Sequence, residues 1–210
     1  MSKLFVISAP SGAGKTSLIR ELLQNNKAKK LKLGISCTTR NKRTSETDGK
    51  DYFFFSKEKF DEGIEKDHFL EYAEVFGNYY GTPRDWVMEN LKQGFKIILE
   101  LDYQGAYQIK ERFRDAKTIF IIPPNFESLE QRLVQRGLDS KDVIKRRLSK
   151  AFNEINEGKN FDNLIANENF EMALEDLETL VLDDEQISTE RTNFSQKCLD
   201  QLLDQKTTLL

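Results

Sequence analysis

The segment that most constrains the fold is a short apolar run followed at once by a glycine-rich turn and a helical pattern. Residues 4–8 read Leu-Phe-Val-Ile-Ser, residues 9–16 read Ala-Pro-Ser-Gly-Ala-Gly-Lys-Thr, and apolar residues recur at helical spacing over 15–23. This pattern predicts a buried strand, a tight turn and a helix, in that order. Such a unit is typical of α/β folds built on a parallel sheet.

The turn matches the phosphate-binding P-loop pattern G-x-x-x-x-G-K-[ST], apart from Ala9, which stands where the first glycine is expected. Gly12 and Gly14 supply the permissive backbone that lets consecutive N–H groups face a phosphate, and the helix N-terminus adds partial positive charge. Lys15 would reach the β- and γ-phosphates of a nucleotide, and the Thr16 hydroxyl would coordinate Mg²⁺. The predicted nucleotide-binding residues are Ala9, Pro10, Ser11, Gly12, Ala13, Gly14, Lys15 and Thr16. The alternative, a glycine-rich turn with a chance Lys-Thr pair, is disfavoured by its position between a strand and a helix.

Three further apolar runs predict buried strands at residues 97–101, 118–122 and 163–166, and the second of these ends at two adjacent prolines. A helix is expected at 104–113, after the first of them. Continuous apolar strands alternating with helices indicate a parallel sheet covered on both faces. We therefore expect an α/β fold, a P-loop NTPase core whose parallel sheet is flanked by helices.

Two stretches interrupt this alternation of strands and helices. Residues 34–93 contain aromatic, β-rich segments around a short helix, as expected of a small lobe inserted into the core. Residues 126–158 have the pattern of two charged helices with Gly137 between them, and the tail from residue 170 onward predicts two amphipathic helices. Thr189 is the expected N-cap of the second tail helix.

Composition excludes several classes of protein. The 210 residues are 38% hydrophobic and 32% charged, and no apolar run approaches the ~20 residues of a membrane helix. The N-terminal apolar run is too short for a secretory signal. Cys37 and Cys198 lie far apart, and His68 is the single histidine, so a disulfide scaffold, a zinc site and histidine-based catalysis are disfavoured. The sequence predicts a soluble cytoplasmic protein with reduced thiols.

A P-loop alone does not separate a kinase from an ATPase, a GTPase or a helicase. The chain is short for a motor or helicase core, and it lacks the Asn-Lys-x-Asp motif of GTPases. Residues 1–152 carry a net charge of +7 and residues 153–210 a net charge of −10. The basic part could bind nucleic acid or smaller phosphorylated ligands, and charge alone does not choose between them.

A second group of residues lies in the expected lobe. Arg40 and Arg43 are three apart, with Tyr52 nearby, and two such arginines suit bidentate capture of a second phosphate. Glu71 follows in the lobe, and a Tyr-Gly-Thr segment occupies residues 80–82.

With these motifs in place the chain resembles guanylate kinases over essentially its whole length. The segments that carry the resemblance, in the family's order, are APSGAGKT, ISCTTR-x-x-R, DGKDYFF, FLEYAEVFGNYYGTP, ILELDYQGA, FIIPP, LEQRLVQRG and IKRRLSKA. The resemblance implies one domain with three parts, which are a P-loop core, an inserted GMP-binding lobe and a mobile helical lid. The implied bounds are 1–33, 94–124 and 159–210 for the core, 34–93 for the lobe and 125–158 for the lid.

The resemblance also implies which residues bind GMP. Its phosphate would be held by Arg40, Arg43, Tyr52 and Tyr80, and its guanine would meet Ser36, Glu71, Thr82 and Asp102. This assignment agrees with the chemistry, because guanine N–H donors suit carboxylates and its O6 acceptor suits hydroxyls. The alternatives are that the two carboxylates are surface charges or ion-pair partners, and that the tyrosines pack in the sheet.

For the lid, the resemblance implies that Arg132, Arg136 and Arg147 clamp the transferring phosphoryl group, together with Lys15 and Arg40. Arg132 and Arg136 are four apart and so share a helix face, which without a P-loop would be interpreted as a solvated surface. Whether Arg146 or Arg147 faces the site is left open by periodicity, and the family pattern favours Arg147. The resemblance places Asn167 near the adenine of the donor.

The implied activity is reversible transfer of the ATP γ-phosphoryl group to GMP or dGMP, with Mg²⁺ as cofactor. Two alternatives stay open, an inert guanylate-kinase-like scaffold that binds phosphorylated peptides, and a kinase for another nucleotide or sugar phosphate. No nucleic-acid or membrane partner is expected, and association into a homodimer is left open.

Overall fold

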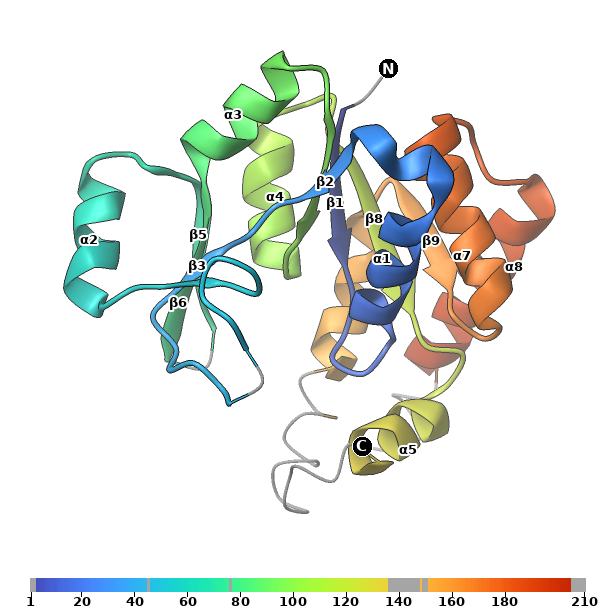
Figure 1. Ribbon diagram of the computed structural model, residues 1–210. Helices are drawn as coiled ribbons and strands as arrows, with labels where there is room; N and C mark the ends of the chain where they lie inside the picture. The colour runs from blue at the N-terminus through green and yellow to red at the C-terminus, as the bar shows by residue number, and fades with distance from the viewer. Residues whose placement is uncertain (1–2, 45, 76, 136–147, 149–150, 205–210) are drawn as a thin grey trace. The chain divides into compact units, whose positions relative to one another are not determined.

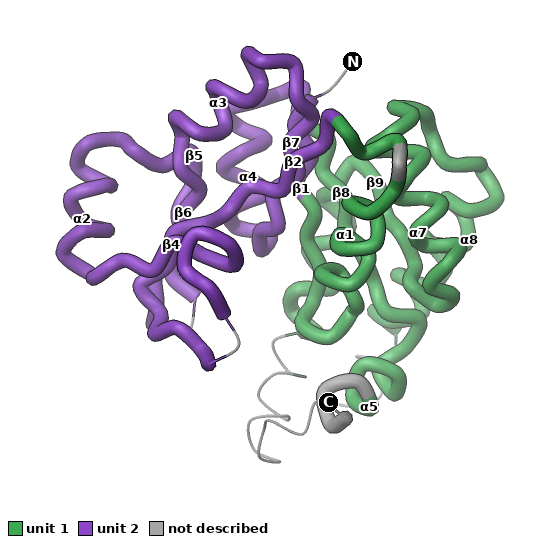
Figure 2. The backbone as a smooth tube through the Cα atoms, in the orientation of Figure 1, with its two compact units in different colours: residues 1, 7–29, 117–210 green, residues 2–6, 30–116 purple. Residues whose placement is uncertain are grey.

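The computed structural model describes residues 3–44, 46–75, 77–135, 148 and 151–204 (Figure 1). Figure 2 shows that the chain divides into two compact units. One unit comprises residues 1, 7–29 and 117–210, and the other comprises residues 2–6 and 30–116. Within the described ranges, no helix is both long enough and apolar enough to cross a membrane.

A five-stranded sheet has the strand order β2-β7-β1-β8-β9. The strands are β1 (Leu4–Ser8), β2 (Leu31–Leu33), β7 (Lys96–Glu100), β8 (Lys117–Ile122) and β9 (Asn163–Ala166). β2 pairs with β7, and β8 pairs with β9, both in parallel. Every residue of β1 is buried, as expected for a strand covered on both faces. The expected α/β class and the four expected strands are confirmed, and β2 is an additional strand.

The unit that holds the glycine-rich turn carries helices around β8 and β9. They are α1 (Lys15–Gln24), α5 (Phe126–Gln135), α7 (Phe170–Glu178) and α8 (Thr189–Asp204), with a 3₁₀ turn at Gly158–Asn160 and a π-helical turn at Thr179–Asp183. Figure 1 shows α1 beside α7, and the Asn25 side chain that follows α1 donates to Glu178 Oε1 at 2.6 Å. α8 packs against β9 and β8, so this helix is part of the same core.

The predicted N-cap of α8 is wrong by one residue. Thr189 is the first residue of the helix, and the Ser188 hydroxyl accepts a hydrogen bond from the Arg191 backbone N–H at 3.3 Å. Both side chains carry a hydroxyl that can cap a helix, so only the backbone geometry separates them.

The other unit contains a four-stranded sheet in the order β4-β3-β6-β5. Its elements include β3 (Cys37–Thr38), β4 (Phe53–Phe54), β5 (Phe69–Val75), β6 (Asn78–Pro83), α2 (Lys57–Glu65), α3 (Arg84–Lys92) and α4 (Tyr103–Arg112). The 3₁₀ turn Asn26–Lys30 contains the boundary between the two units. β6 pairs antiparallel with both β3 and β5. The β-rich segments and the short helix expected within residues 34–93 are therefore present.

Helix α4 is attached to β5 by side-chain hydrogen bonds to its backbone. Gln108 accepts from the Tyr72 N–H at 3.2 Å and donates to the Tyr72 carbonyl at 2.8 Å. Arg112 donates to the carbonyl of Leu70 at 2.6 Å. Because β5 is an edge strand, these bonds satisfy backbone groups that have no neighbouring strand on that side. They also fix α4 against the strand that carries Glu71.

Candidate active site

The turn after β1 has the backbone conformation that a phosphate cradle requires. Gly12 has φ +94° and Gly14 has φ +96°, both in the left-handed region that favours glycine. The Ala13 N–H donates to the Pro10 carbonyl at 3.1 Å and closes the turn. Helix α1 starts at the next residue, Lys15, so its N-terminal N–H groups and partial positive charge lie at the loop.

Two side chains form hydrogen bonds with the backbone of this loop. Asn167, directly after β9, donates from Nδ2 to the Ala13 carbonyl at 2.7 Å. Glu154, within helical residues 151–157, accepts a hydrogen bond from the Ser11 N–H at 3.3 Å. Sequence reasoning missed Glu154, because the two residues are 143 positions apart and no local pattern marks the contact.

Lys15 and Thr16 form the start of α1, where Lys15 is half-buried and Thr16 is exposed. An ammonium and a hydroxyl at the N-terminus of a helix suit a phosphate chain with a bound Mg²⁺. Magnesium usually keeps several waters and takes few protein ligands, so an exposed hydroxyl fits that role.

In the β-rich unit, three residues predicted to bind a phosphate lie together. The Tyr52 and Tyr80 rings meet edge-on with centroids 6.0 Å apart, and the Arg40 guanidinium carbon lies 5.5 Å from the centre of the Tyr52 ring. Burial raises the pKa of the Tyr52 phenol, which keeps it a hydrogen-bond donor at neutral pH. The tyrosines therefore pack in the lobe, as one alternative proposed, and still present hydroxyls near the arginine.

A carboxylate that the sequence analysis missed links the two arginines. Glu46 Oε1 lies 2.7 Å from Arg40 Nη2 and 3.9 Å from Arg43 Nη1, and Glu46 Oε2 accepts from the Arg43 N–H at 2.8 Å. The hydrogen bond from Arg40 holds the pKa of Glu46 below its usual range. Spacing alone could have flagged it, since Glu46 lies three residues after Arg43. The arginines thus already have one carboxylate partner, and a bound phosphate would share or replace it.

The predicted guanine-binding pair is buried. Glu71 on β5 is 3% exposed, Thr82 on β6 is 1% exposed, and the Thr82 hydroxyl donates to Glu71 Oε1 at 2.6 Å. The other carboxylate oxygen, Oε2, lies against Gly105 of α4, where a Cβ added to the glycine would be only 2.7 Å away. Glu71 is therefore not a solvated surface charge, which was one alternative.

Burial, reinforced by the charge of Asp102, raises the pKa of Glu71 to about 7, against the opposing influence of Thr82 and Arg112. A carboxylate that is buried at this cost is suited to a ligand with N–H donors, because such donors favour its ionised form.

The remaining predicted substrate residues have defined local roles. Asp102 is the N-cap of α4, and its Oδ1 accepts from the Gly105 N–H at 3.1 Å. Ser36 precedes β3, and its carbonyl accepts from the Phe53 N–H at 2.9 Å. The other oxygen, Oδ2, accepts a hydrogen bond from Gln104 Nε2 at 3.3 Å. Because a carboxylate oxygen can accept more than one hydrogen bond, both contacts are compatible with a further bond to a ligand.

Comparisons with known proteins identify the family of this chain. The family model for guanylate kinases matches residues 1–184. The guanylate kinase of Aliivibrio fischeri is 49% identical over 183 residues, which cover 86% of this chain and 88% of the relative. That of Pasteurella multocida is 44% identical over 201 residues, which cover 95% and 97%. The crystal structure of guanylate kinase from Anaplasma phagocytophilum is similar with a TM-score of 0.72 at 31% identity, over 95% of this chain and 94% of that one.

The chain belongs to the guanylate kinase family. The lid arginines that the family resemblance implied are only partly placed. Arg132 lies on α5, and Arg136 and Arg147 lie outside the described residues. Their clamping role stays a prediction, as does the choice between Arg146 and Arg147.

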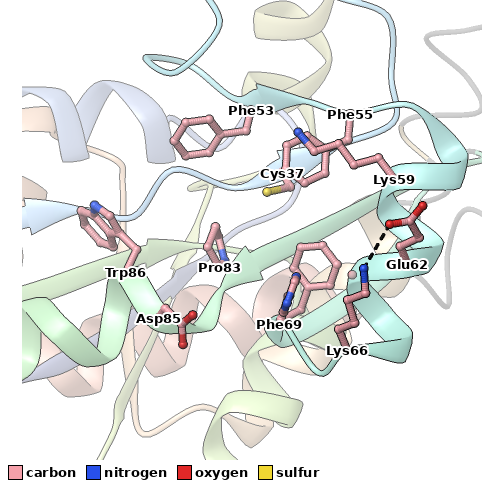
Figure 3. Close-up of a pocket in the computed structure, with 12 residues that line it drawn as sticks. Cys37, Phe53, Phe55, Lys59, Glu62, Lys66, Phe69, Pro83, Asp85 and Trp86 are labelled. Atoms are coloured by element: carbon pink, nitrogen blue, oxygen red, sulfur yellow. Dashed lines mark hydrogen bonds and ion pairs between the residues drawn. The ribbon is translucent and has the colours of Figure 1, made fainter.

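The β-rich unit also holds a cavity of about 460 Å³ that is separate from the predicted substrate residues, none of which lines it. Figure 3 shows its mostly apolar lining, with Cys37, Phe69 and Trp86, and the ion pair between Lys66 and Glu62. The Lys66 Nζ and Glu62 Oε2 atoms of this pair are 3.3 Å apart. Burial raises the pKa of the Cys37 thiol to about 12, so the thiol stays protonated and poorly nucleophilic.

Proposed function

We propose that this protein transfers the γ-phosphoryl group of ATP to GMP, reversibly, and that the residues described above carry out the transfer. The observation that best supports the acceptor is the buried Glu71 carboxylate, hydrogen-bonded to Thr82, in a lobe that also holds Arg40 and Tyr52. Guanine offers a ring N–H and an amino group to a carboxylate, whereas adenine offers an unprotonated ring nitrogen at the matching place.

The donor nucleotide would bind at the loop between β1 and α1. Backbone N–H groups of the loop and the N-terminus of α1 would hold its phosphates, and Lys15 would contact the β- and γ-phosphates. The Thr16 hydroxyl would help to hold Mg²⁺, whose positive charge would stabilise the negative charge on the transferring group. The acceptor oxygen of GMP is already ionised, so the chain needs no general base and no covalent intermediate.

Catalysis by this chain would therefore consist of positioning and charge stabilisation. Arg40 and Arg43 would hold the GMP phosphate, and the lid arginines would contact the transferring group. The predicted GMP contacts address the base and the phosphate, so we propose that dGMP is also accepted. Since both cysteines are free and buried, we further propose that the protein works in the reducing cytoplasm.

The experiment that tests this proposal mixes the purified protein with Mg·ATP and GMP and follows GDP and ADP by chromatography. Equal amounts of GDP and ADP should form, and excess EDTA should stop the reaction. Tight GMP binding without ADP formation would instead support an inert scaffold.

A further inference from the structure

Asn167 occupies a position from which one side chain connects the sheet to the phosphate-binding loop. It follows β9 directly and is 4% exposed, and its backbone N–H donates to the carbonyl of Ile122 at the end of β8 at 2.9 Å. Its side-chain amide then donates from Nδ2 to the Ala13 carbonyl at 2.7 Å. Both ends of the residue are therefore fixed, one on the sheet and the other on the loop.

The hydrogen bond from Asn167 to the Ala13 carbonyl also restricts the orientation of the Gly14 N–H, because both groups belong to one peptide unit. The Ala13 carbonyl and the Gly14 N–H belong to the same planar trans peptide, so they point in opposite directions. A hydrogen bond that fixes the carbonyl outward also fixes the N–H toward the other side of the peptide. Gly14, at φ +96°, has no side chain that would restrict rotation of this peptide. The hydrogen bond from Asn167 to the Ala13 carbonyl acts on this peptide directly, beside the backbone bonds of the Ala13 N–H and the Gly14 carbonyl.

We propose that Asn167 is a positioning residue for the phosphate-binding loop, which acts by orienting the peptide between Ala13 and Gly14 so that the Gly14 N–H faces the donor's phosphates. This inference rests on the proposed function of the loop, and it assigns Asn167 to the triphosphate rather than to the base. The chemical group it serves is thus common to every nucleoside triphosphate.

Helix α8 forms a hydrogen bond with β9 at the edge of that strand that does not pair with β8. The buried Ser195 hydroxyl accepts a hydrogen bond from the Ala166 N–H at 3.1 Å, one residue before Asn167. β9 is the last strand in the sheet order, so this N–H would otherwise lie at a sheet edge. The family model ends at residue 184, and α8 lies beyond that point. The C-terminal helix therefore fixes the strand end from which Asn167 reaches the loop.

The test uses a ligand that has phosphates and no base. Binding of Mg·tripolyphosphate, Mg·ATP and GMP is measured by calorimetry for the wild type and for Asn167→Ala. Loss of one buried hydrogen bond should weaken tripolyphosphate and ATP by a similar factor of about ten and leave GMP unchanged. Asn167→Asp, which has nearly the same shape and cannot donate when ionised, should weaken both phosphate ligands at least as much, and it serves as the main variant if Asn167→Ala does not fold.

Asn169→Ala is the matched control. Asn169 lies two residues further on and caps α7 by accepting from the Met172 N–H at 3.0 Å, so its loss should lower stability without changing phosphate binding. Weaker ATP binding with unchanged tripolyphosphate binding would overturn the proposal in favour of contact with adenine. An equal loss of GMP binding would overturn it in favour of a general structural role. Failure of the wild type to phosphorylate GMP would refute the proposed function and leave these binding results interpretable.

Discussion

Lys15 is half-buried at the first position of α1, directly after the two left-handed glycines of the loop. Replacing it with alanine removes the ammonium that would meet the developing charge on the transferring phosphoryl group. We expect Lys15→Ala to lower kcat by about 10²- to 10⁴-fold, a range typical of lost charge-stabilising groups. Thermal unfolding should stay close to that of the wild type.

The control for this variant is Lys57→Ala, which removes an exposed lysine at the start of α2. It should retain full activity. A large fall in the melting temperature of Lys15→Ala, parallel to its loss of activity, would show that the lysine supports the fold.

The raised pKa of Glu71, about 7, gives a pH dependence with a definite sign. Above this pKa the carboxylate is ionised and accepts hydrogen bonds from the guanine N–H groups. Below it the carboxyl is protonated, and its O–H group is placed against the guanine N–H donors, which weakens binding. KM for GMP should therefore rise as the pH falls, by about tenfold per unit below pH 6, while KM for ATP changes little. Three neighbouring groups influence the pKa of this carboxyl: Thr82 and Arg112 lower it, and Asp102 raises it.

Glu71→Gln separates this effect from titration of the GMP phosphate. The variant has no carboxyl at position 71, so the steep part of its profile should disappear even though its KM is higher throughout. Identical pH profiles in the wild type and the variant would refute a role for Glu71 ionisation.

Single residues also mark what the sequence could and could not predict. Lys15, Gly12 and Gly14 lie in one local motif, whose spacing defines both the turn and its ligand class. Glu154 and the Asn167–Ala13 bond depend on residues more than 140 positions apart, and no periodicity reports such a contact. The family resemblance implies a base-binding role for Asp102, and its capping of α4 becomes visible only with the backbone in place.

Among the elements, the contact between α4 and β5 gives a sharp test, because Gly105 lies under the Glu71 carboxylate. Gly105 has ordinary helical backbone, so alanine would favour the helix intrinsically by about 0.5–1 kcal/mol. Its Cβ would nevertheless lie 2.7 Å from Glu71 Oε2 and must displace that carboxylate. We expect Gly105→Ala to lower kcat/KM for GMP by about tenfold or more, with binding of ATP unchanged.

Glu111→Ala, an exposed substitution on the same helix, is the control for the kinetics of Gly105→Ala. Wild-type values of kcat/KM for Gly105→Ala would mean that α4 does not set the position of Glu71.

The elements that are predicted correctly share a strong local signal. Residues 118–122 are a continuous apolar run, and residues 15–23 have apolar residues at helical spacing. The expected strand and the expected helix are both present. β2 is absent from the sequence prediction because Leu31–Leu33 is three residues long and has a lysine at its centre, so pairing with β7 rather than composition makes it a strand. The N-cap prediction for α8 names Thr189 in place of Ser188 because adjacent hydroxyl residues produce the same pattern.

Over the full chain, the charge distribution agrees with a reaction between two polyanions. The net charge of −3 combines +7 over residues 1–152 with −10 over residues 153–210. The basic part contains the phosphate-binding loop and the predicted GMP residues, and the acidic part contains α7 and α8. Two phosphate-bearing substrates repel each other, and positively charged residues reduce this repulsion when they react. The net charge of the whole chain conceals the basic character of residues 1–152.

Guanine recognition by the buried Glu71 and the half-buried Asp102 is tested most sharply by comparing kcat/KM for GMP and AMP in the wild type, Glu71→Gln and Asp102→Asn. The wild type should prefer GMP by about 10⁴-fold or more, because AMP leaves buried acceptors unpaired. Glu71→Gln should lower kcat/KM for GMP more than for AMP and so narrow the preference. Equal use of AMP by the wild type, or an unchanged ratio in both variants, would contradict the assignment of these carboxylates to guanine recognition.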